Sequence, residues 1–397
     1  MLHIHSGESG RAIEAHPLNF SGTGSGYARV WLVNLLLNAL TLGLYTPWAR
    51  RRTAVYFYDH TEVAHAPLEF VAQQKRMVLG FLMLVGLYLA FQIASETGQD
   101  LAVMLFMLAG AALAPWLWGS AMRFRLGNTR WRGLRLQFRA SWREIYLASW
   151  PVFALALIWG AIVWAALGSY DPDTPGWRPP GWLWAASAAA LIGSVLCVIR
   201  LEYNYQRLLV RRAFLGEQAG RWKPVYGDFV RIWLATVGVF VVGLALALAL
   251  LVLGIGGSAL AAFKLKSGMG MVLAALGAIV AGLALLVVAS APARAYREAR
   301  MFQLVWNQIG VSQIARFKSH LNTRRFILLR MKNMLLTLLT LGFYRPFALV
   351  SEYRMKVDSV TLYVKGGLDQ VVGQLQAAPG HGLGDAAADA LGLDLIG

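Results

Sequence analysis

Six long apolar stretches constrain this chain more than any other feature of its sequence. A helix needs about 20 apolar residues to cross the hydrocarbon of a bilayer, and none of the six has Asp, Glu, Lys or Arg in its interior. They comprise residues 77–95, 101–120, 145–169, 181–199, 232–256 and 268–293. The sequence therefore predicts a polytopic α-helical membrane protein with six transmembrane helices.

The distribution of basic residues predicts how these spans are oriented. The chain has a net charge of +17 at pH 7, and its Lys and Arg residues concentrate in alternate loops. Cytoplasmic loops of membrane proteins are enriched in Lys and Arg, so we expect residues 121–143, 200–231 and 294–330 to lie in the cytoplasm, together with both termini. Because the basic residues bracket apolar spans, they predict contact with membrane lipids and no nucleic-acid partner.

Two shorter apolar segments, 30–45 and 326–344, do not fit as simple spans. Each is followed by a proline and then by further basic residues. A single crossing by the first segment would separate Arg50, Arg51 and Arg52 from the other basic loops, against the usual charge rule. We therefore expect two short helices that either re-enter the cytoplasmic side of the membrane or lie flat at its interface.

The same two regions contain an internal repeat. Residues 34–49 align without gaps on residues 333–348, and ten of the sixteen positions are identical. Gly and Pro recur in both copies and predict a turn that ends each short helix. The residues of the two turns are Gly43, Tyr45, Pro47, Gly342, Tyr344 and Pro346.

A stripe of polar residues accompanies each copy of the repeat, at spacings that place them on one face of a helix. The stripes comprise Asn34, Asn38 and Thr41 in the first copy and Asn333, Thr337 and Thr340 in the second. Such groups can hydrogen-bond to neighbouring helices. Alternatively, the two stripes face each other and line a polar path or a headgroup pocket, as duplicated broken helices do in transporters. The sequence leaves both interpretations open.

An aromatic and basic cluster follows the first turn. Trp48 precedes Arg50, Arg51 and Arg52. Tryptophan anchors at the level of lipid headgroups, and arginine binds their phosphates. The cluster is therefore either a contact for lipid headgroups or a plain topology signal.

Short segments between the apolar stretches have the alternation that is typical of β-strands. Residues 133–138 alternate apolar and polar side chains, as a half-buried strand does. Thr61 and Phe70 have the same spacing as Thr129 and Phe138. We expect a few short strands that form a small cytoplasmic sheet.

These features divide the chain into four parts. Residues 1–76 form a cytoplasmic N-terminal segment with the first short helix, and residues 77–293 form the six-helix bundle. Residues 294–365 form a second cytoplasmic segment with the second short helix, and residues 366–397 form a tail rich in Ala, Gly and Asp.

The sequence contains no recognisable catalytic constellation. Its seven His residues form no HExxH motif, and no pair of them stands beside a carboxylate at ligand spacing. The six spans also lack the ionisable residues that ion-coupled transporters place in the membrane. We therefore predict no enzymatic activity, no metal and no cofactor.

The paired motif Thr-Leu-Gly-x-Tyr-x-Pro-[Trp/Phe]-Ala, the Asn-Thr-x-Trp-x-Gly loop at 128–133 and the pattern of spans resemble the YjgN-like family of bacterial inner-membrane proteins. The resemblance covers residues 17–397, with Phe347 standing where the first copy has Trp48. It implies a location in the bacterial inner membrane, and it implies no activity, since the family is functionally uncharacterised. It also suggests a membrane metallopeptidase as a partner.

Two functions are compatible with these features. The first is transport or lipid handling through a site at the duplicated half-helices, for which the repeated polar stripes argue. The second is a non-enzymatic scaffold or regulatory subunit that binds another membrane protein, such as a metallopeptidase. The large basic loops and the absence of catalytic motifs favour the second. No oligomeric state is predicted.

Overall fold

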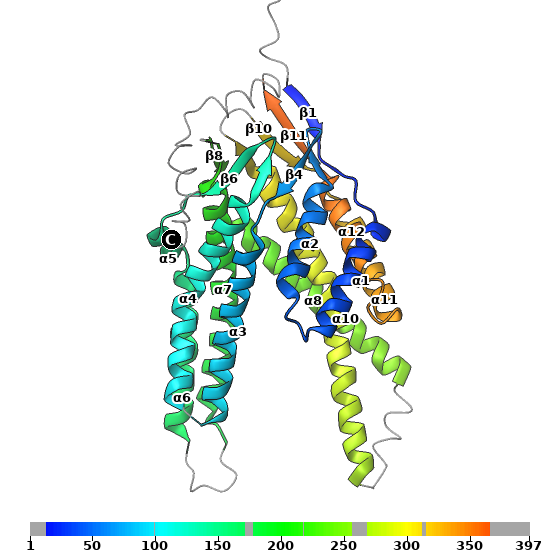
Figure 1. The fold of residues 1–397 in the computed structure, drawn as a ribbon. Helices are drawn as coiled ribbons and strands as arrows, with labels where there is room; N and C mark the ends of the chain where they lie inside the picture. Colours follow the sequence, from blue (N-terminus) through cyan, green and yellow to red (C-terminus); the bar gives the residue numbers. More distant parts are fainter. Residues whose placement is uncertain are drawn as a thin grey trace, which may run out of the picture.

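The protein consists of a β-sheet at one end and long helices that extend away from it (Figure 1). The computed structural model describes residues 13–98, 100–170, 178–216, 218–255, 268–311 and 315–365. The tail predicted at 366–397 lies outside these residues.

Five helical pairs follow one another along the chain, and strands precede and follow each pair. The helices are α1 (Gly24–Leu40) with α2 (Thr46–Asp59), α3 (Gln74–Glu96) with α4 (Asp100–Gly127), α5 (Trp142–Ala148) and α6 (Trp150–Ser169) with α7 (Gly181–Arg212), α8 (Tyr226–Ile255) with α10 (Gly268–Gln308), and α11 (Thr323–Leu339) with α12 (Arg345–Val357). The strands are β1 (Ile13–Pro17), β2 (Asn19–Phe20), β3 (Thr61–Val63), β4 (Ala66–Phe70), β5 (Thr129–Trp131), β6 (Leu134–Phe138), β7 (Ala213–Leu215), β8 (Gln218–Trp222), β9 (Ile309–Val311), β10 (Ala315–Ser319) and β11 (Val360–Lys365).

The eleven strands form one antiparallel sheet that is nearly closed into a barrel. Strands β1 and β2 stand at its two ends, yet only Leu18 separates them along the chain. The Leu18 N–H donates to the Val360 carbonyl at 2.9 Å, and the Phe20 N–H donates to Asp358 Oδ1 at 3.0 Å. A single short segment therefore joins both ends of the sheet.

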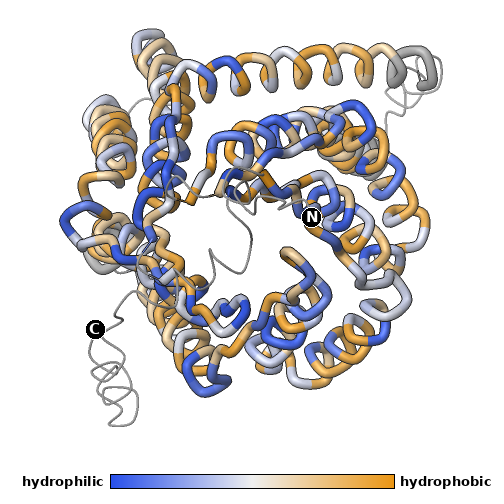
Figure 2. Tube along the Cα trace, turned by 90° about the horizontal axis from the view of Figure 1, so that it is seen from above, coloured by the Kyte–Doolittle hydropathy of each residue, from blue (hydrophilic) through white to orange (hydrophobic). Residues whose placement is uncertain are grey.

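The register of the sheet repeats at every helical pair. In each case, the last strand residue before the pair lies opposite the first strand residue after it. These junctions are Phe20 with Thr61, Phe70 with Thr129, Phe138 with Ala213, Trp222 with Ile309, and Ser319 with Val360. All five pairs thus leave the sheet at equivalent positions. Seen from above, the elements are arranged around a ring (Figure 2), which is completed where α1 packs against α12.

The core of the protein lies beneath the sheet, because alternate strand residues point inward. The buried apolar side chains of this core include Phe20, Trp131, Leu134, Leu362 and Val364. Most charged residues of the strands are exposed, whereas Glu62 of β3 is half-buried. The sheet therefore has an apolar inner face and a polar outer face, as expected where one face of an antiparallel sheet meets water.

The long helices bury few of their apolar side chains against the rest of the protein. None of the most apolar window of α6 is buried, and only 6% of the corresponding window of α3 is. Contiguous exposed apolar surface of this size requires an apolar environment around it. The helices therefore fit a lipid surrounding and not water.

The predicted class, six transmembrane helices with a few short strands, is wrong. In the described part of the chain, four helices are long and apolar enough to cross a membrane. They comprise Gln74–Glu96, Trp150–Ser169, Gly181–Arg212 and Tyr226–Ala249. The other two predicted spans, 101–120 and 268–293, are parts of α4 and α10. Hydropathy identifies apolar runs alone, and the strands that make up the sheet leave no such signal.

The sheet is much larger than the small one predicted. The segment 133–138 does contain strand β6, and Thr61 and Thr129 begin β3 and β5. Of the strands that were not predicted, β7 has three residues, too few to show the alternation that identifies a strand. Strands β1, β8 and β11 have five or six residues, and they pair with strands that lie far away along the chain.

Candidate functional site

The two repeated segments form helical hairpins with the same turn. Helix α1 ends at Leu40 and α2 begins at Thr46. Between them, Leu42 has φ +50° and Gly43 has φ +89°. The Gly43 N–H donates to the carbonyl of Asn38 at 2.8 Å. Glycine adopts this left-handed conformation without steric cost, so the chain reverses direction within five residues.

The second hairpin, between α11 and α12, reproduces this geometry. Leu341 has φ +50° and Gly342 has φ +95°, and the Gly342 N–H donates to the carbonyl of Thr337 at 2.7 Å. The helices predicted at 30–45 and 326–344 are therefore displaced. They begin earlier, at Gly24 and Thr323, and end before the turns.

In each copy, the three predicted turn residues, a Gly, a Tyr and a Pro, have different roles in the turn. Pro47 and Pro346 lie in the first turns of α2 and α12, where a missing N–H costs nothing. The backbone N–H of Tyr45 donates to Thr41 Oγ1 at 3.0 Å. In the second copy, the N–H of Tyr344 donates to Thr340 Oγ1 at 2.9 Å. Thr41 and Thr340 of the polar stripes thus close the turns.

The tips of both hairpins are apolar and exposed. Leu42 is 95% exposed and Leu341 is 90% exposed. A left-handed conformation costs a residue other than glycine about 1–2 kcal/mol, and asparagine or glycine is preferred there. Leucine in this conformation at both tips is therefore unfavourable for the fold alone. Both hairpins point away from the sheet, in the general direction of the long helices (Figure 1).

Asn34 and Asn333 make the same contact in the two hairpins. Asn34 Nδ2 donates to the carbonyl of Ala49 at 3.3 Å, and Asn333 Nδ2 donates to the carbonyl of Ala348 at 3.3 Å. Both side chains are buried. Within the described residues, the Oδ1 atoms of both lack a hydrogen-bond partner. Buried acceptors are normally satisfied, so each hairpin presents an acceptor that a water or ligand donor could satisfy.

The two polar stripes do not share one cavity. A cavity of about 410 Å³ beside the first hairpin is lined by Asn34, Asn38 and Arg50 among others. A cavity of about 300 Å³ beside the second is lined by Asn333 and Thr337 among others. The stripes therefore lie within their own hairpins, and the structure does not bring them together across a common path.

The second cavity is amphipathic. Its apolar wall includes Val287 of α10 and Leu338 of α11, and its polar wall includes Arg294, Asn333 and Thr337. An apolar wall next to a cation and hydrogen-bonding groups suits an amphiphile, whose polar head and hydrocarbon need different surroundings.

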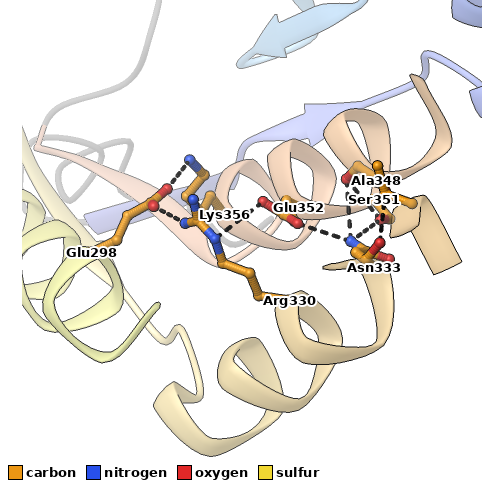
Figure 3. Close-up of polar contacts among 8 residues, drawn as sticks. Glu298, Arg330, Asn333, Ala348, Ser351, Glu352 and Lys356 are labelled. Atoms are coloured by element: carbon orange, nitrogen blue, oxygen red, sulfur yellow. Dashed lines mark hydrogen bonds and ion pairs between the residues drawn. The ribbon is translucent and has the colours of Figure 1, made fainter. Parts of the chain in front are cut away.

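A network of charged residues continues from Asn333 (Figure 3). Asn333 Nδ2 also donates to Glu352 Oε1 at 3.0 Å. Glu352 lies 3.8 Å from Arg330 Nε, and Arg330 forms an ion pair with Glu298. Lys356 Nζ donates to the other carboxylate oxygen of Glu298 at 2.9 Å. The network therefore connects α10, α11 and α12.

The environment of the network changes the pKa of Lys356. Burial lowers the pKa of its ammonium below the usual value, and the nearby charge of Arg330 lowers it further, whereas Glu352 raises it. The network contains two carboxylates, Glu298 and Glu352, and two cations, Arg330 and Lys356, so its charges balance. This network was not predicted from the sequence, because Glu298 of α10 meets its partners in α11 and α12 across 32 and 58 residues.

The predicted headgroup cluster is only partly free to bind a ligand. Arg51 Nε donates to the carbonyl of Ala72 at 3.0 Å, and Arg52 lies over the ring of Tyr45 at 5.9 Å. Arg50 is exposed and lines the first cavity. Trp48 stacks on Tyr45 beside the turn and is 40% exposed.

The fold and these hairpins define a helical membrane protein whose helical pairs extend from a barrel-like sheet. The chain belongs to the family described as "Bacterial protein of unknown function (DUF898)", which matches residues 15–390. This match, together with the relatives described next, confirms the predicted YjgN-like family.

Curated relatives are named for their location. The chain is 28% identical over 144 residues to "Inner membrane protein YjgN" of Salmonella typhimurium, a region that covers 36% of this chain and 35% of that protein. It is 25% identical over 146 residues to the protein of the same name from Escherichia coli K12, covering 37% and 36%. The similarity thus spans about a third of each relative's length. No solved structure matches the chain. These names support a location in the bacterial inner membrane.

Proposed function

We propose that this protein handles lipids through its two helical hairpins. The apolar tips insert into the cytoplasmic leaflet, and the cavities behind them hold the polar heads of amphiphiles. The observation that carries this proposal is the left-handed, almost fully exposed leucine at each tip, Leu42 and Leu341. Such a side chain is unfavourable in water and in its own backbone conformation, and it becomes favourable in hydrocarbon.

The cavities support the same function. In the second hairpin, Asn333 lines the cavity together with Arg330 and Glu352, and its Oδ1 has no partner within the described residues. Arg294 adds a positive charge at the polar wall of this cavity. An anionic headgroup with a hydroxyl or ammonium donor would satisfy both groups, since Arg binds phosphate and the amide oxygen accepts a hydrogen bond.

The polar stripes provide the test. Replacing Asn34, Asn38, Asn333 and Thr337 together by Leu is expected to weaken lipid binding to the purified protein by about tenfold or more, because each change removes a polar partner of the headgroup. Lipid binding is measured by native mass spectrometry or by labelled lipid in detergent titrations.

A matched control separates this effect from a general loss of stability. The double variant Thr97→Leu and Thr236→Leu replaces polar residues at the end of α3 and in α8 whose hydroxyls donate to carbonyls of their own helices. It is expected to bind lipid as the natural protein does. The single variant Thr337→Leu leaves the charged network intact and should still reduce binding. Equal lipid binding by the quadruple variant and the natural protein would refute the proposal.

The proposed function requires the sheet to face the cytoplasm. We propose this orientation, with both termini on the same side, from the positions of the basic residues. In a Cys197→Ser background, a single cysteine at Glu96 is expected to react with an impermeant reagent added to intact cells. A cysteine at Arg316, exposed on β10, should react only after the cells are opened. The reverse pattern would contradict this orientation.

A scaffold that binds another membrane protein is the alternative function. It is favoured by exposed basic residues on the outer face of the sheet, which are Arg130, Arg135, Arg221, Arg316, Lys318 and Lys365. An acidic partner, such as a domain of a membrane metallopeptidase, would complement them. A stoichiometric partner that is lost on Arg130→Glu and Arg316→Glu, with unchanged lipid binding, would favour the scaffold.

A further inference from the structure

We infer that a second site, in the cleft between α5 and α7, binds the phosphate of an anionic ligand. This site shares no residue with the hairpins, so it stands or falls independently of the proposed function. The cleft has a volume of about 670 Å³, and none of its residues belongs to a repeated motif.

The cleft is lined by one face of α7. Arg200, Asn204, Arg207 and Arg211 follow at intervals of four, three and four residues, and such spacings bring side chains to the same side of a helix. The opposite wall is formed by the end of α5 and the start of α6, including Trp150. The walls are held together because Asn204 Nδ2 donates to the carbonyl of Ala148, at the end of α5, at 2.9 Å.

The charge of the lining is strongly positive. Four arginines and one carboxylate line the cleft. The carboxylate, Glu144, already binds Arg212 through two of its guanidinium nitrogens. Arg200 lies over the rings of two tyrosines. Within the described residues, neither Arg207 nor Arg211 has an ion pair with a carboxylate.

Two exposed guanidinium groups one helical turn apart match the needs of a phosphate. Each guanidinium can donate two parallel hydrogen bonds to phosphate oxygens. Arg207 and Arg211 can thus bind one phosphate together, with Arg200 providing further positive charge deeper in the cleft. A carboxylate ligand would use only one such pair, so the spacing favours the more highly charged anion.

The position of the cleft favours a lipid as the source of the phosphate. Residues 181–199 of α7 contain no charged side chain, so the apolar surface of this candidate span ends at Arg200. Trp150 begins α6, another candidate span, and is 49% exposed. Tryptophan and arginine at the ends of apolar spans lie at headgroup level. The end of the cleft at Trp150 and Arg200 therefore lies at headgroup level, and Arg207 and Arg211 follow about 10 and 16 Å further along α7.

The experiment uses the purified full-length chain in a mild, lipid-free detergent. Phosphatidylglycerol, phosphatidylcholine, glycerol 3-phosphate and inorganic phosphate are titrated separately, and binding is followed by native mass spectrometry and by the midpoint of thermal unfolding. The test variant is Arg207→Gln with Arg211→Gln. The control is Arg324→Gln with Arg325→Gln, which removes the same charge from two exposed arginines of α11 outside the cleft.

We expect native mass spectra to show one phosphatidylglycerol bound at this site in the natural protein and in the control, and its affinity to be about tenfold or more weaker in the test variant, while any lipid bound at the hairpins is unchanged. The test variant should keep the unfolding midpoint of the natural protein without ligand, because neither side chain holds an ion pair. If glycerol 3-phosphate or phosphate binds with the same dependence on Arg207 and Arg211, the site takes free phosphates as well. Equal losses in both double variants, or none in either, would overturn the site.

Failure of this site would leave the hairpin proposal untouched. Loss of lipid binding in the stripe variant, with normal binding in the Arg207 and Arg211 variant, would show that only the hairpins bind lipid. The opposite result would show that only the cleft does. The two proposals are thus tested by different residues on different helices.

Discussion

Replacing Leu42 and Leu341 together by Asp is expected to remove both hairpin tips from the bilayer while the sheet stays folded. Each leucine is almost fully exposed in the protein, so the substitution disturbs no packing. In hydrocarbon, however, a carboxylate costs about 2–3 kcal/mol at each tip. For the two tips together, this corresponds to a loss of about 1,000-fold or more in membrane insertion.

The depth of the tips provides the measurement. A single cysteine at Leu40 or Leu339, in a Cys197→Ser background, carries an environment-sensitive fluorophore in nanodiscs. We expect its emission to be quenched by spin-labelled acyl chains in the natural protein and not in the Asp variant. The control is Leu328→Asp, an exposed leucine of α11 far from the turn, which should leave the quenching unchanged.

Substitution of asparagine at the same positions distinguishes an effect on folding stability from an effect on membrane insertion. Because asparagine adopts the left-handed conformation more readily than leucine, Leu42→Asn and Leu341→Asn are expected to raise stability in detergent by up to about 1 kcal/mol per site. The same variants should insert less well into bilayers. A loss of stability in detergent would mean that the leucines contribute to packing, and it would contradict the assigned role of the tips.

The second large effect is expected at Glu298. Glu298→Gln leaves Arg330 and Lys356 without their shared carboxylate. The three side chains are between 24% and 36% exposed, so the cost lies between those of surface and buried pairs, at about 1–3 kcal/mol. We expect a lower midpoint of thermal unfolding, together with weaker attachment of α11 and α12 to α10, visible as faster proteolysis of this hairpin.

Two further variants identify the cause of this loss. Removing one cation as well, in Glu298→Gln with Lys356→Gln, is expected to restore part of the lost stability because it relieves the repulsion with Arg330. Asp228→Asn breaks the pair with Arg231, which is 82% exposed, and should change the midpoint by little. If Glu298→Gln and Asp228→Asn lowered the unfolding midpoint equally, the network would contribute no more to stability than an exposed ion pair.

The hairpins could be located from sequence because their signals are local. Gly43 and Gly342 stand beside proline in a repeated motif, and both residue types interrupt helices for steric reasons. The exact helix ends were not predictable, since Leu42 and Leu341 adopt a conformation that leucine rarely takes. Helices α1 and α11 therefore end at Leu40 and Leu339, although the apolar residues that follow would also be compatible with a longer helix.

The charged network and the sheet depend on contacts that the sequence does not display. Glu298 meets Arg330 and Lys356 across 32 and 58 residues, and no periodicity links them. Several strands show no alternation in the sequence, yet the strand before each helical pair is held by the strand after that pair. Hydropathy identified the apolar helices, and four of those in the described part of the chain are long and apolar enough to cross a membrane.

The joining of β1 to β11 also constrains the order in which this protein can be completed. Strand β11 is synthesised roughly 350 residues after β1, and the two pair along five positions. Until then, β1 and β10 both expose unpaired edges, which are templates for association with other chains. Pairing across such a separation is slow because a long loop must close. The last step of biogenesis is therefore the closure of the ring, and the chain is most prone to aggregate just before it.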